Sequence, residues 1–156
     1  MVLEILYLCP KIISMQILIW CLCWLSFFQP ETSPAHSGTL AVTIDNIKVG
    51  NGKIMLALYN VEADFLSTKT FRAIEQSVSE EGKITVLLTD LHHGTYAISL
   101  YHDENNNGKL DTNFIKIPKE PYGFSNDAKG VFGPPKYKDA SFLFLKEKQE
   151  LTISLN

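Results

Sequence analysis

The residues with the clearest chemical potential in this sequence are oxygen-bearing side chains spaced two apart within one short stretch. Asp103, Asn105 and Asn107 alternate along the chain, Gly108 follows the third of them, and Asp111 falls at the ninth position of the series. Alternate residues of a tightly curled loop point toward one centre, and calcium needs several oxygens at close range. The spacing matches the beginning of the calcium-binding loop of an EF-hand, in which a glycine at the sixth position provides the sharp turn.

The predicted calcium ligands come from this stretch and from one residue beyond it. The ligands in the loop are Asp103, Asn105, Asn107, the backbone carbonyl of Lys109, and Asp111 directly or through water. The twelfth position carries a bidentate glutamate in an EF-hand but is Phe114 here. Glu120 is the candidate for the missing ligand if its segment folds back, and the alternative for Glu120 is a surface carboxylate. Because Asp, Asn and Gly are also common turn formers, a plain turn is the alternative to the metal site.

Strands of alternating apolar and polar residues must position this loop. The alternation predicts strands over residues 39–48, 53–59, 84–88, 95–102, 141–145 and 151–155. Gly50-Asn51-Gly52 predicts a hairpin turn after the first strand, and residues 90–94 predict a turn before the strand that leads to Asp103. Residues 60–81 are less regular, and their apolar side chains either line a short helix or anchor a loop over a sheet. The series predicts an all-β fold, an antiparallel β-sandwich of about seven strands.

A long loop rich in proline, glycine and aromatic residues follows the acidic stretch, between Asp111 and Lys138. Prolines lack the amide hydrogen that a strand ladder needs, so most of this segment cannot be central strand. Its polar and aromatic residues are candidates for a recognition surface for a glycan or a surface protein: Tyr122, Phe124, Ser125, Asn126 and Tyr137. The alternatives are a small aromatic core beneath the loop, and polar side chains that cap a turn.

Residues 1–37 have the features of a signal peptide. Ile12 to Phe28 is almost wholly apolar, Lys11 precedes it, and the small residues Ala35 and Ser37 predict cleavage after Ser37. The alternative is an uncleaved membrane anchor, because the apolar run is at the lower edge of the length that spans a bilayer. In that case the protein would contact a membrane only through this segment.

Residues 38–156 are predicted to form a single exported domain. The whole chain has a net charge of −3 and no block of basic residues, which argues against nucleic acid as a partner. The domain contains no cysteine, because all three lie in the leader, at positions 9, 21 and 23. Disulfides, thiolate metal ligands and a cysteine nucleophile are therefore excluded from it. A periplasmic or secreted location is expected, and translation begins at either Met1 or Met15.

The sequence contains no convincing catalytic constellation. Ser125 is not in a Gly-x-Ser-x-Gly motif, and the adjacent His92 and His93 point to opposite sides of an extended turn. The chain is therefore interpreted as a binding module rather than an enzyme. A hydrolase in which Glu120, His102 and Ser125 converge on an open pocket is the alternative from another functional class.

Several short stretches taken together carry a resemblance to a known family. They are Gly94-Thr95-Tyr96-Ala97, His102-Asp103-Glu104-Asn105, Gly108-Lys109-Leu110-Asp111, Ile117 to Asn126, and Asp139-Ala140-Ser141-Phe142. On these stretches the chain resembles a bacterial exported family called domain of unknown function 2141, over residues 38–156. The resemblance implies a signal peptide and a small β-sandwich of transthyretin or carboxypeptidase-regulatory type, without an established activity. The chain departs from the family pattern at His92 and His93, where prolines are usual.

The sequence as a whole predicts an exported β-sandwich module that binds Ca²⁺ through an EF-hand-like loop. Only two certain carboxylates indicate weak binding with a structural role, with a dissociation constant on the order of 10⁻⁴ to 10⁻³ M, as in extracellular calcium modules. The alternative function is a carbohydrate-binding or adhesive module that uses the aromatic residues of the long loop.

Overall fold

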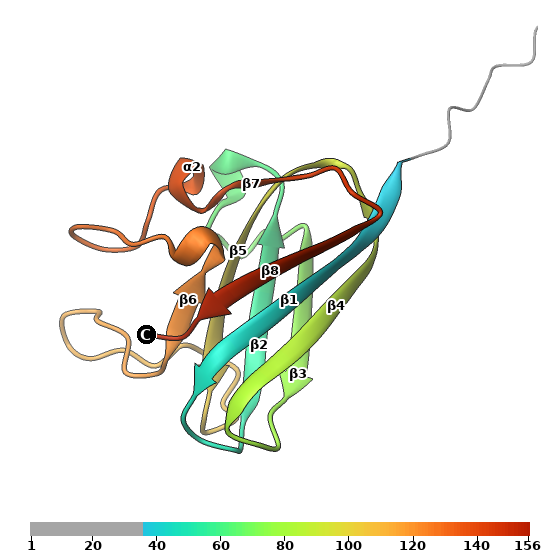
Figure 1. The fold of residues 1–156 in the computed structure, drawn as a ribbon. Helices are drawn as coiled ribbons and strands as arrows, with labels where there is room; N and C mark the ends of the chain where they lie inside the picture. Colours follow the sequence, from blue (N-terminus) through green and yellow to red (C-terminus); the bar gives the residue numbers. More distant parts are fainter. Residues whose placement is uncertain (1–35) are drawn as a thin grey trace, which may run out of the picture. The chain divides into compact units, whose positions relative to one another are not determined.

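Two β-sheets built from eight strands make up the domain, in a computed structural model that describes residues 36–156 (Figure 1). The first sheet has the strand order β4-β1-β8, with β1 at Ser37–Ile47, β4 at Gly82–His92 and β8 at Lys148–Ser154. The second has the order β3-β2-β5-β6, with β2 at Lys53–Tyr59, β3 at Arg72–Ser77, β5 at Gly94–Asp103 and β6 at Tyr122–Phe124. Strand β7, at Phe142–Phe144, pairs with the start of β5. The predicted all-β sandwich is confirmed.

The hydrophobic core lies between the two sheets and comes from alternate residues of their strands. On β1 the buried residues are Leu40, Val42 and Ile44, and on β2 they are Ile54, Leu56 and Leu58. This alternation arises because successive side chains of a strand point to opposite faces of its sheet. The core is contained within residues 36–156, which form one compact unit. We therefore expect this unit to fold as an independent domain.

The predicted hairpin at Gly50–Gly52 is wrong. Strand β1 pairs with β4 and β8, whereas β2 pairs with β3 and β5, so the turn carries the chain from one sheet to the other. Turn residues specify that the chain reverses, but not which strand each flanking segment joins. Gly52 has a φ of 82°, and a Cβ atom there would clash with the backbone carbonyl of Asp103. The crossing therefore passes directly against the end of β5.

Three further differences concern the connections. The predicted turn over 90–94 is wrong, because β4 continues to His92 and His93 alone separates it from β5. The irregular segment 60–81 forms a short 3₁₀ turn, η1 at Glu62–Asp64, and strand β3, which the sequence did not indicate. One strand pair, β1 with β8, is parallel within an otherwise antiparallel arrangement. A chain terminus that returns to the first strand can pair in either direction, and side-chain alternation is the same for both.

The long loop contains short ordered elements. Strand β6 is followed by a 3₁₀ turn, η2 at Ser125–Asp127, and by a single helical turn, α2 at Tyr137–Ala140. Both β6 and β7 pair with β5, at opposite ends of that strand. The signal peptide, the possible anchor and the three leader cysteines lie outside the described residues. Within residues 36–156, none of the helices has the length and apolar character needed to cross a membrane.

Candidate functional site

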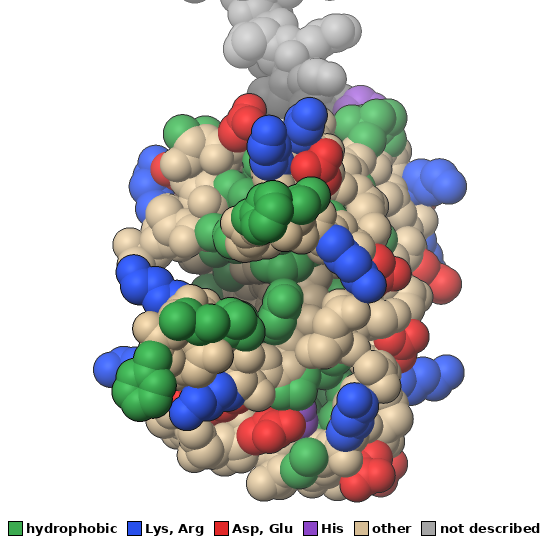
Figure 2. Space-filling view, turned by 90° about the vertical axis from the view of Figure 1, so that its left-hand side faces the viewer, with side chains coloured by type: hydrophobic (Ala, Val, Ile, Leu, Met, Phe, Trp, Pro, Cys, Tyr) green, Lys and Arg blue, Asp and Glu red, His purple; other side chains and the backbone are tan. Residues whose placement is uncertain are grey.

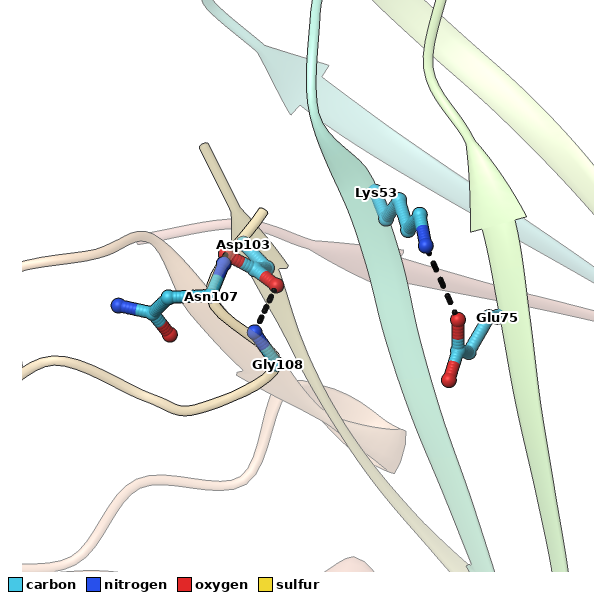
Figure 3. Close-up of polar contacts among 5 residues, drawn as sticks. All are labelled: Lys53, Glu75, Asp103, Asn107 and Gly108. Atoms are coloured by element: carbon cyan, nitrogen blue, oxygen red, sulfur yellow. Dashed lines mark hydrogen bonds and ion pairs between the residues drawn. The ribbon is translucent and has the colours of Figure 1, made fainter. Parts of the chain in front are cut away.

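Strand β5 places Asp103 at the mouth of the acidic loop. Asp103 is the last residue of this central strand and is only 1% exposed. Its two carboxylate oxygens accept hydrogen bonds from the backbone N–H groups of Asn107, at 3.0 Å, and Gly108, at 2.7 Å (Figure 3). Left-handed backbone at Asn106 (φ 60°) and Gly108 (φ 73°) allows the loop to turn this sharply. The loop therefore curls around the Asp103 carboxylate.

The other predicted ligands of the loop lie within the same curl. The side-chain oxygen of Asn105 accepts a hydrogen bond from the Asn107 N–H at 3.0 Å, and that of Asn107 accepts one from the Lys109 N–H at 2.8 Å. The Asn105 amide also donates to the Asp111 carboxylate at 2.8 Å. The sequence spacing thus translates into a curl in which Asp103, Asn105 and Asn107 each accept hydrogen bonds from the loop backbone and Asn105 contacts Asp111.

Glu120 lies against this loop and joins its two ends. One carboxylate oxygen accepts a hydrogen bond from the Glu104 N–H at 3.2 Å, and the other accepts one from the Asp111 N–H at 3.0 Å. A backbone hydrogen bond from Lys119 to the Asp111 carbonyl, 2.8 Å long, holds the returning segment in place. The Glu120 side chain is buried, with 7% of its residue surface exposed. It is therefore not the surface carboxylate that was the alternative interpretation.

The carboxylates of this site have no cationic side chain as a partner. Lys53 is directly opposite Asp103 in the β2–β5 register, yet its ammonium group is 3.2 Å from Glu75 on β3 (Figure 3). Within residues 36–156, neither Asp103 nor Asp111 nor Glu120 forms an ion pair with a side chain. Burial of an ionised carboxylate is unfavourable unless hydrogen bonds or an opposite charge compensate for it. Among the described residues, hydrogen bonds alone compensate for the burial of the Asp103 and Glu120 carboxylates.

The negative charge also affects a neighbouring tyrosine. Burial raises the pKa of Tyr101 above its ordinary value of 10.0, and the charges of Asp103, Glu120 and Glu75 raise this pKa further. Tyr101 and Asp103 are two residues apart on β5, so their side chains share one face of the strand. Tyr101 is therefore a natural reporter of the charge at the loop.

The described part of the chain contains no group of three His, Cys, Asp or Glu side chains placed to hold a metal ion. Asp103, Asp111 and Glu120 are therefore not gathered into a metal-holding group by themselves, and the predicted ligand set depends as well on Asn105, Asn107 and the Lys109 carbonyl. The buried His102 is bound elsewhere, since its Nε2 lies 2.6 Å from the Asn51 carbonyl. His102 is the next-to-last residue of β5, and its buried side chain packs beside the loop.

The aromatic residues of the long loop pack together in a small cluster. Phe65, from the segment after β2, lies against Phe124 and Tyr137, with ring centroids 6.4 and 5.6 Å apart. Tyr122 meets Phe124 edge to face, at an interplanar angle of 72°. Tyr122, Phe124 and Tyr137 are all half-buried, and their rings are not coplanar. This geometry is typical of a satellite core rather than of a flat platform for stacking sugars.

Ser125 and Asn126 connect the strands beside this cluster. The Ser125 hydroxyl is buried, accepts a hydrogen bond from the Ile98 N–H at 2.8 Å and donates one to the Ala140 carbonyl. The exposed Asn126 amide donates to the carbonyls of Asp139 and Ser141. Ser125 does not hydrogen-bond to His102 or to Glu120, so the three residues of the hydrolase alternative are not assembled.

Sequence reasoning missed Asn113, which organises the tip of the acidic loop. Its side-chain oxygen accepts hydrogen bonds from the N–H groups of Ile115, at 3.0 Å, and Ile117, at 2.9 Å. Its backbone closes the same turn through Ile117 and Lys116. The available signal was an asparagine just before an apolar run, a position in which asparagine commonly bonds to the following backbone.

The fold and this site define a class of protein, an all-β sandwich domain with a carboxylate-bearing loop at one end of its central strand. A family model described as "Uncharacterized protein conserved in bacteria" (DUF2141) matches residues 42–152. The chain belongs to this family. No curated protein and no solved structure matches the chain. The likeness to transthyretin-type sandwiches stays a prediction.

Proposed function

We propose that this protein is an exported β-sandwich module that binds Ca²⁺ through the loop that follows β5. The ligands would be Asp103, Asn105, Asn107, the Lys109 carbonyl, Asp111 and Glu120. The ion would have a structural role, because it would tie the long segment after Asp111 to the end of the central strand. Export is inferred from the apolar leader and the absence of cysteine from the domain.

The observation that carries this proposal is a pair of buried carboxylates that form no ion pair with a cationic side chain among residues 36–156. Asp103 precedes the loop and Glu120 follows it, and within residues 36–156 both carboxylates accept hydrogen bonds from backbone N–H groups of the loop. Each carboxylate oxygen has more than one lone-pair site, so a hydrogen-bonded carboxylate can still coordinate a metal. Because Lys53 pairs with Glu75, the Asp103 carboxylate is left with hydrogen bonds from the loop backbone and no ion pair among the described side chains.

The chemistry of the site favours calcium over transition metals. All predicted ligands are oxygens from carboxylates, amides and a backbone carbonyl, and calcium accepts such sets with flexible geometry. Zinc and copper sites rely on imidazole or thiolate ligands. The imidazole of His102 has its Nε2 at the Asn51 carbonyl and its Nδ1 4.0 Å from the Glu104 carboxylate, and residues 36–156 offer no group of three His, Cys, Asp or Glu side chains that would suit zinc.

The test is thermal unfolding of the domain with calcium and with chelator. At a calcium concentration ten times the dissociation constant, binding stabilises the folded state by ~1.4 kcal/mol. We expect the melting temperature to rise in millimolar calcium, and the rise to disappear in Asp103→Asn and Glu120→Gln. A Glu147→Gln variant is the matched control, because Glu147 is an exposed carboxylate in the connection between β7 and β8.

A second readout separates binding from general stabilisation. Residues 36–156 contain no tryptophan, so terbium bound in the loop would be sensitised by tyrosine alone, with Tyr101 two residues from Asp103 and Tyr122 two residues from Glu120. We expect terbium emission that calcium displaces and that Tyr101→Phe reduces. An unchanged melting temperature at millimolar calcium, together with no terbium emission, would reject the proposal.

A further inference from the structure

Two loop tips on one side of the domain carry its most exposed hydrophobic side chains. Phe114 and Phe132 are 108% and 102% exposed, Val131 is 88% exposed and Ile115 is 74% exposed. These residues lie in the β5–β6 connection and in the segment between η2 and α2, two loops that project in the same direction (Figure 1). Figure 2 faces this side and shows hydrophobic side chains on two protrusions, with lysine or arginine side chains and some acidic side chains around them. These side chains add nothing to the core.

The first tip is a hydrogen-bonded turn rather than a loose loop. The Asn113 side chain accepts hydrogen bonds from the N–H groups of Ile115 and Ile117. The Asn113 N–H donates to the Ile117 carbonyl at 2.8 Å, and the Lys116 N–H donates to the Asn113 carbonyl at 3.0 Å. This frame presents Phe114 and Ile115 outward in a defined conformation.

The second tip is closed by glycine. The backbone of Gly130 approaches the carbonyls of Gly133 and Pro134 so closely that a Cβ atom at position 130 would clash with both. Gly133 has a φ of 122°, a conformation that only glycine adopts readily. Val131 and Phe132 therefore stand at the apex of a narrow turn.

The exposed charge around the two tips is positive, although the whole chain has a net charge of −3. Between residues 109 and 138, all the lysines are exposed: Lys109, Lys116, Lys119, Lys129, Lys136 and Lys138. Of the three acidic residues in the same span, Asp127 is exposed, Asp111 is half-buried and Glu120 is buried, and the next residue of α2, Asp139, is also exposed. The surface beside the tips thus carries more accessible cations than anions.

We propose that the two tips, formed by Phe114, Ile115, Val131 and Phe132, dock the domain on an anionic lipid surface. Apolar side chains enter the boundary between headgroups and acyl chains, and lysines around them contact the anionic headgroups. Five of the six lysines lie on the same two loops as the apolar tips, and Lys138 lies in the adjoining turn α2, so both kinds of contact can form in one orientation.

The shape and charge of this side favour a lipid surface over a protein partner. A protein interface is packed as densely as a protein interior, so two separate convex tips would require a partner with two matching pockets. Acyl chains adapt to any convex shape. The surplus of accessible lysines complements anionic headgroups, whereas a second copy of this chain would present the same positive charge and repel it.

The test uses residues 36–156, which contain their own core, because the apolar leader would bind vesicles by itself. The domain is sedimented with vesicles of phosphatidylcholine alone and with vesicles in which a third of the lipid is phosphatidylglycerol. We expect sedimentation with the anionic vesicles, decreasing as salt is added. Combined Phe114→Ala and Phe132→Ala substitution is expected to reduce partitioning by at least about tenfold. Leu87→Ala, which truncates a 61% exposed side chain on β4 in the other sheet, is the matched control.

Two lysine substitutions test how much positive charge contributes to membrane binding. Lys116→Gln and Lys129→Gln, one in each loop, are each expected to weaken binding to anionic vesicles by about fivefold. Lys83→Gln on β4, also exposed, should leave binding unchanged.

Tryptophan introduced at the tips reports insertion directly, because Trp20 and Trp24 both lie in the leader. The emission of Phe114→Trp and of Phe132→Trp should shift to the blue on addition of anionic vesicles, and that of Leu87→Trp should not. The proposal is overturned if the domain ignores both vesicle types, or if the double alanine variant sediments like the wild type. It is also overturned if the wild type self-associates and the double variant does not, since a second copy would then be the occupant.

Membrane docking and calcium binding use different residues, so the experiments can reject one proposal and leave the other standing. The first tip is held by Asn113 and not by a predicted calcium ligand. We therefore expect vesicle binding both in calcium and in chelator, so the loss of one activity would not remove the other.

Discussion

The Ser125 hydroxyl takes the place of a strand-to-strand hydrogen bond along one edge of β5. Strand β6 pairs with Ser99 to Tyr101, and β7 pairs with Gly94 to Tyr96. Ile98 lies in the gap between these two pairings, and its N–H donates to Ser125 instead. A buried backbone donor without a partner costs free energy, so this small side chain is structural rather than catalytic.

Substitution of this serine tests that role. Ser125→Ala should lower the free energy of unfolding by about 1–3 kcal/mol, because it leaves the Ile98 N–H and the Ala140 carbonyl without their partner. Urea denaturation measures the change. Ser141→Ala is the matched control, since the Ser141 hydroxyl donates to the Lys138 carbonyl in an exposed position. Equal midpoints for the two variants would contradict the role of Ser125.

Three tyrosines with raised pKa values indicate how the free energy of unfolding should change at alkaline pH. Burial raises the pKa values of Tyr96, Tyr101 and Tyr137 above the ordinary value of 10.0. The unfolded chain therefore releases these protons at lower pH than the folded domain does. The stabilisation is complete below about pH 10 and is lost as the pH rises through the raised values. Denaturation midpoints measured across this range should fall, and Tyr101→Phe should reduce the fall.

Bound calcium should act on Tyr101 in the opposite direction. A cation beside Asp103 and Glu120 offsets the charges that raise the pKa of this tyrosine. We expect calcium to lower the Tyr101 pKa toward its ordinary value, as measured by the ultraviolet absorbance of tyrosinate. The difference should be absent in Tyr101→Phe. A titration curve unaffected by saturating calcium would contradict the proposed position of the ion.

At the scale of elements, β5 and the crossing from β1 to β2 together position the acidic loop. Strand β5 lies between β2 on one side and the short strands β6 and β7 on the other. Its end is therefore fixed by neighbours on both edges. The crossing passes against the Asp103 carbonyl at Gly52, where no side chain fits. The loop is thus built on a rigid base, which favours a preformed site.

Two glycines with positive φ, Gly52 and Gly82, allow the cost of backbone strain to be measured separately from the cost of a steric clash. Gly52→Ala and Gly82→Ala both force alanine into a positive φ, which costs about 1–2 kcal/mol. Only position 52 adds a clash, because nothing lies within 4 Å of a Cβ at position 82. We expect Gly52→Ala to lower the melting temperature more and also to weaken calcium binding. Calcium titrations should find Gly82→Ala equal to the wild type.

At the scale of the whole molecule, the C-terminal segment closes the sandwich. Strand β7 adds to the second sheet, and β8 then joins the first sheet beside β1. The turn between them therefore crosses from one sheet to the other, as does the turn between β1 and β2. Phe144 on β7 is fully buried in the shared core. Strands β7 and β8 thus connect the two sheets, because β7 pairs with a strand of one sheet and β8 with a strand of the other.

Adjacent residues on β7 test this contribution. Phe144→Ala should destabilise the domain by about 3–5 kcal/mol, because it removes a large side chain from a packed core. Leu143→Ala, whose side chain points to the opposite face and is 56% exposed, should change stability by less than about 0.5 kcal/mol. Chemical denaturation provides both values, and similar losses for the two would show that the core does not depend on Phe144.

The sequence was sufficient wherever a short-range pattern decides the structure. Alternation located β2 at residues 53–59 and the central strand that ends at Asp103, and the spacing of oxygen side chains located the curled loop. Glu120 was predicted to reach this loop only if its segment folded back, and the contact depends on a backbone hydrogen bond from Lys119. Strand β3 was missed because its buried face is only half covered, which weakens the alternation.

The sequence by itself determined the all-β class, most of the strands and the curl of the acidic loop, because these depend on residues within a few positions of one another. The tertiary structure alone decided which sheet each strand joins, the parallel pairing of β8, and the use of Ser125 as a strand substitute. It also decided that Lys53 pairs with Glu75 rather than with Asp103. These outcomes depend on contacts between residues far apart in the chain, whose partners are selected by the shared core and not by their own sequence neighbours.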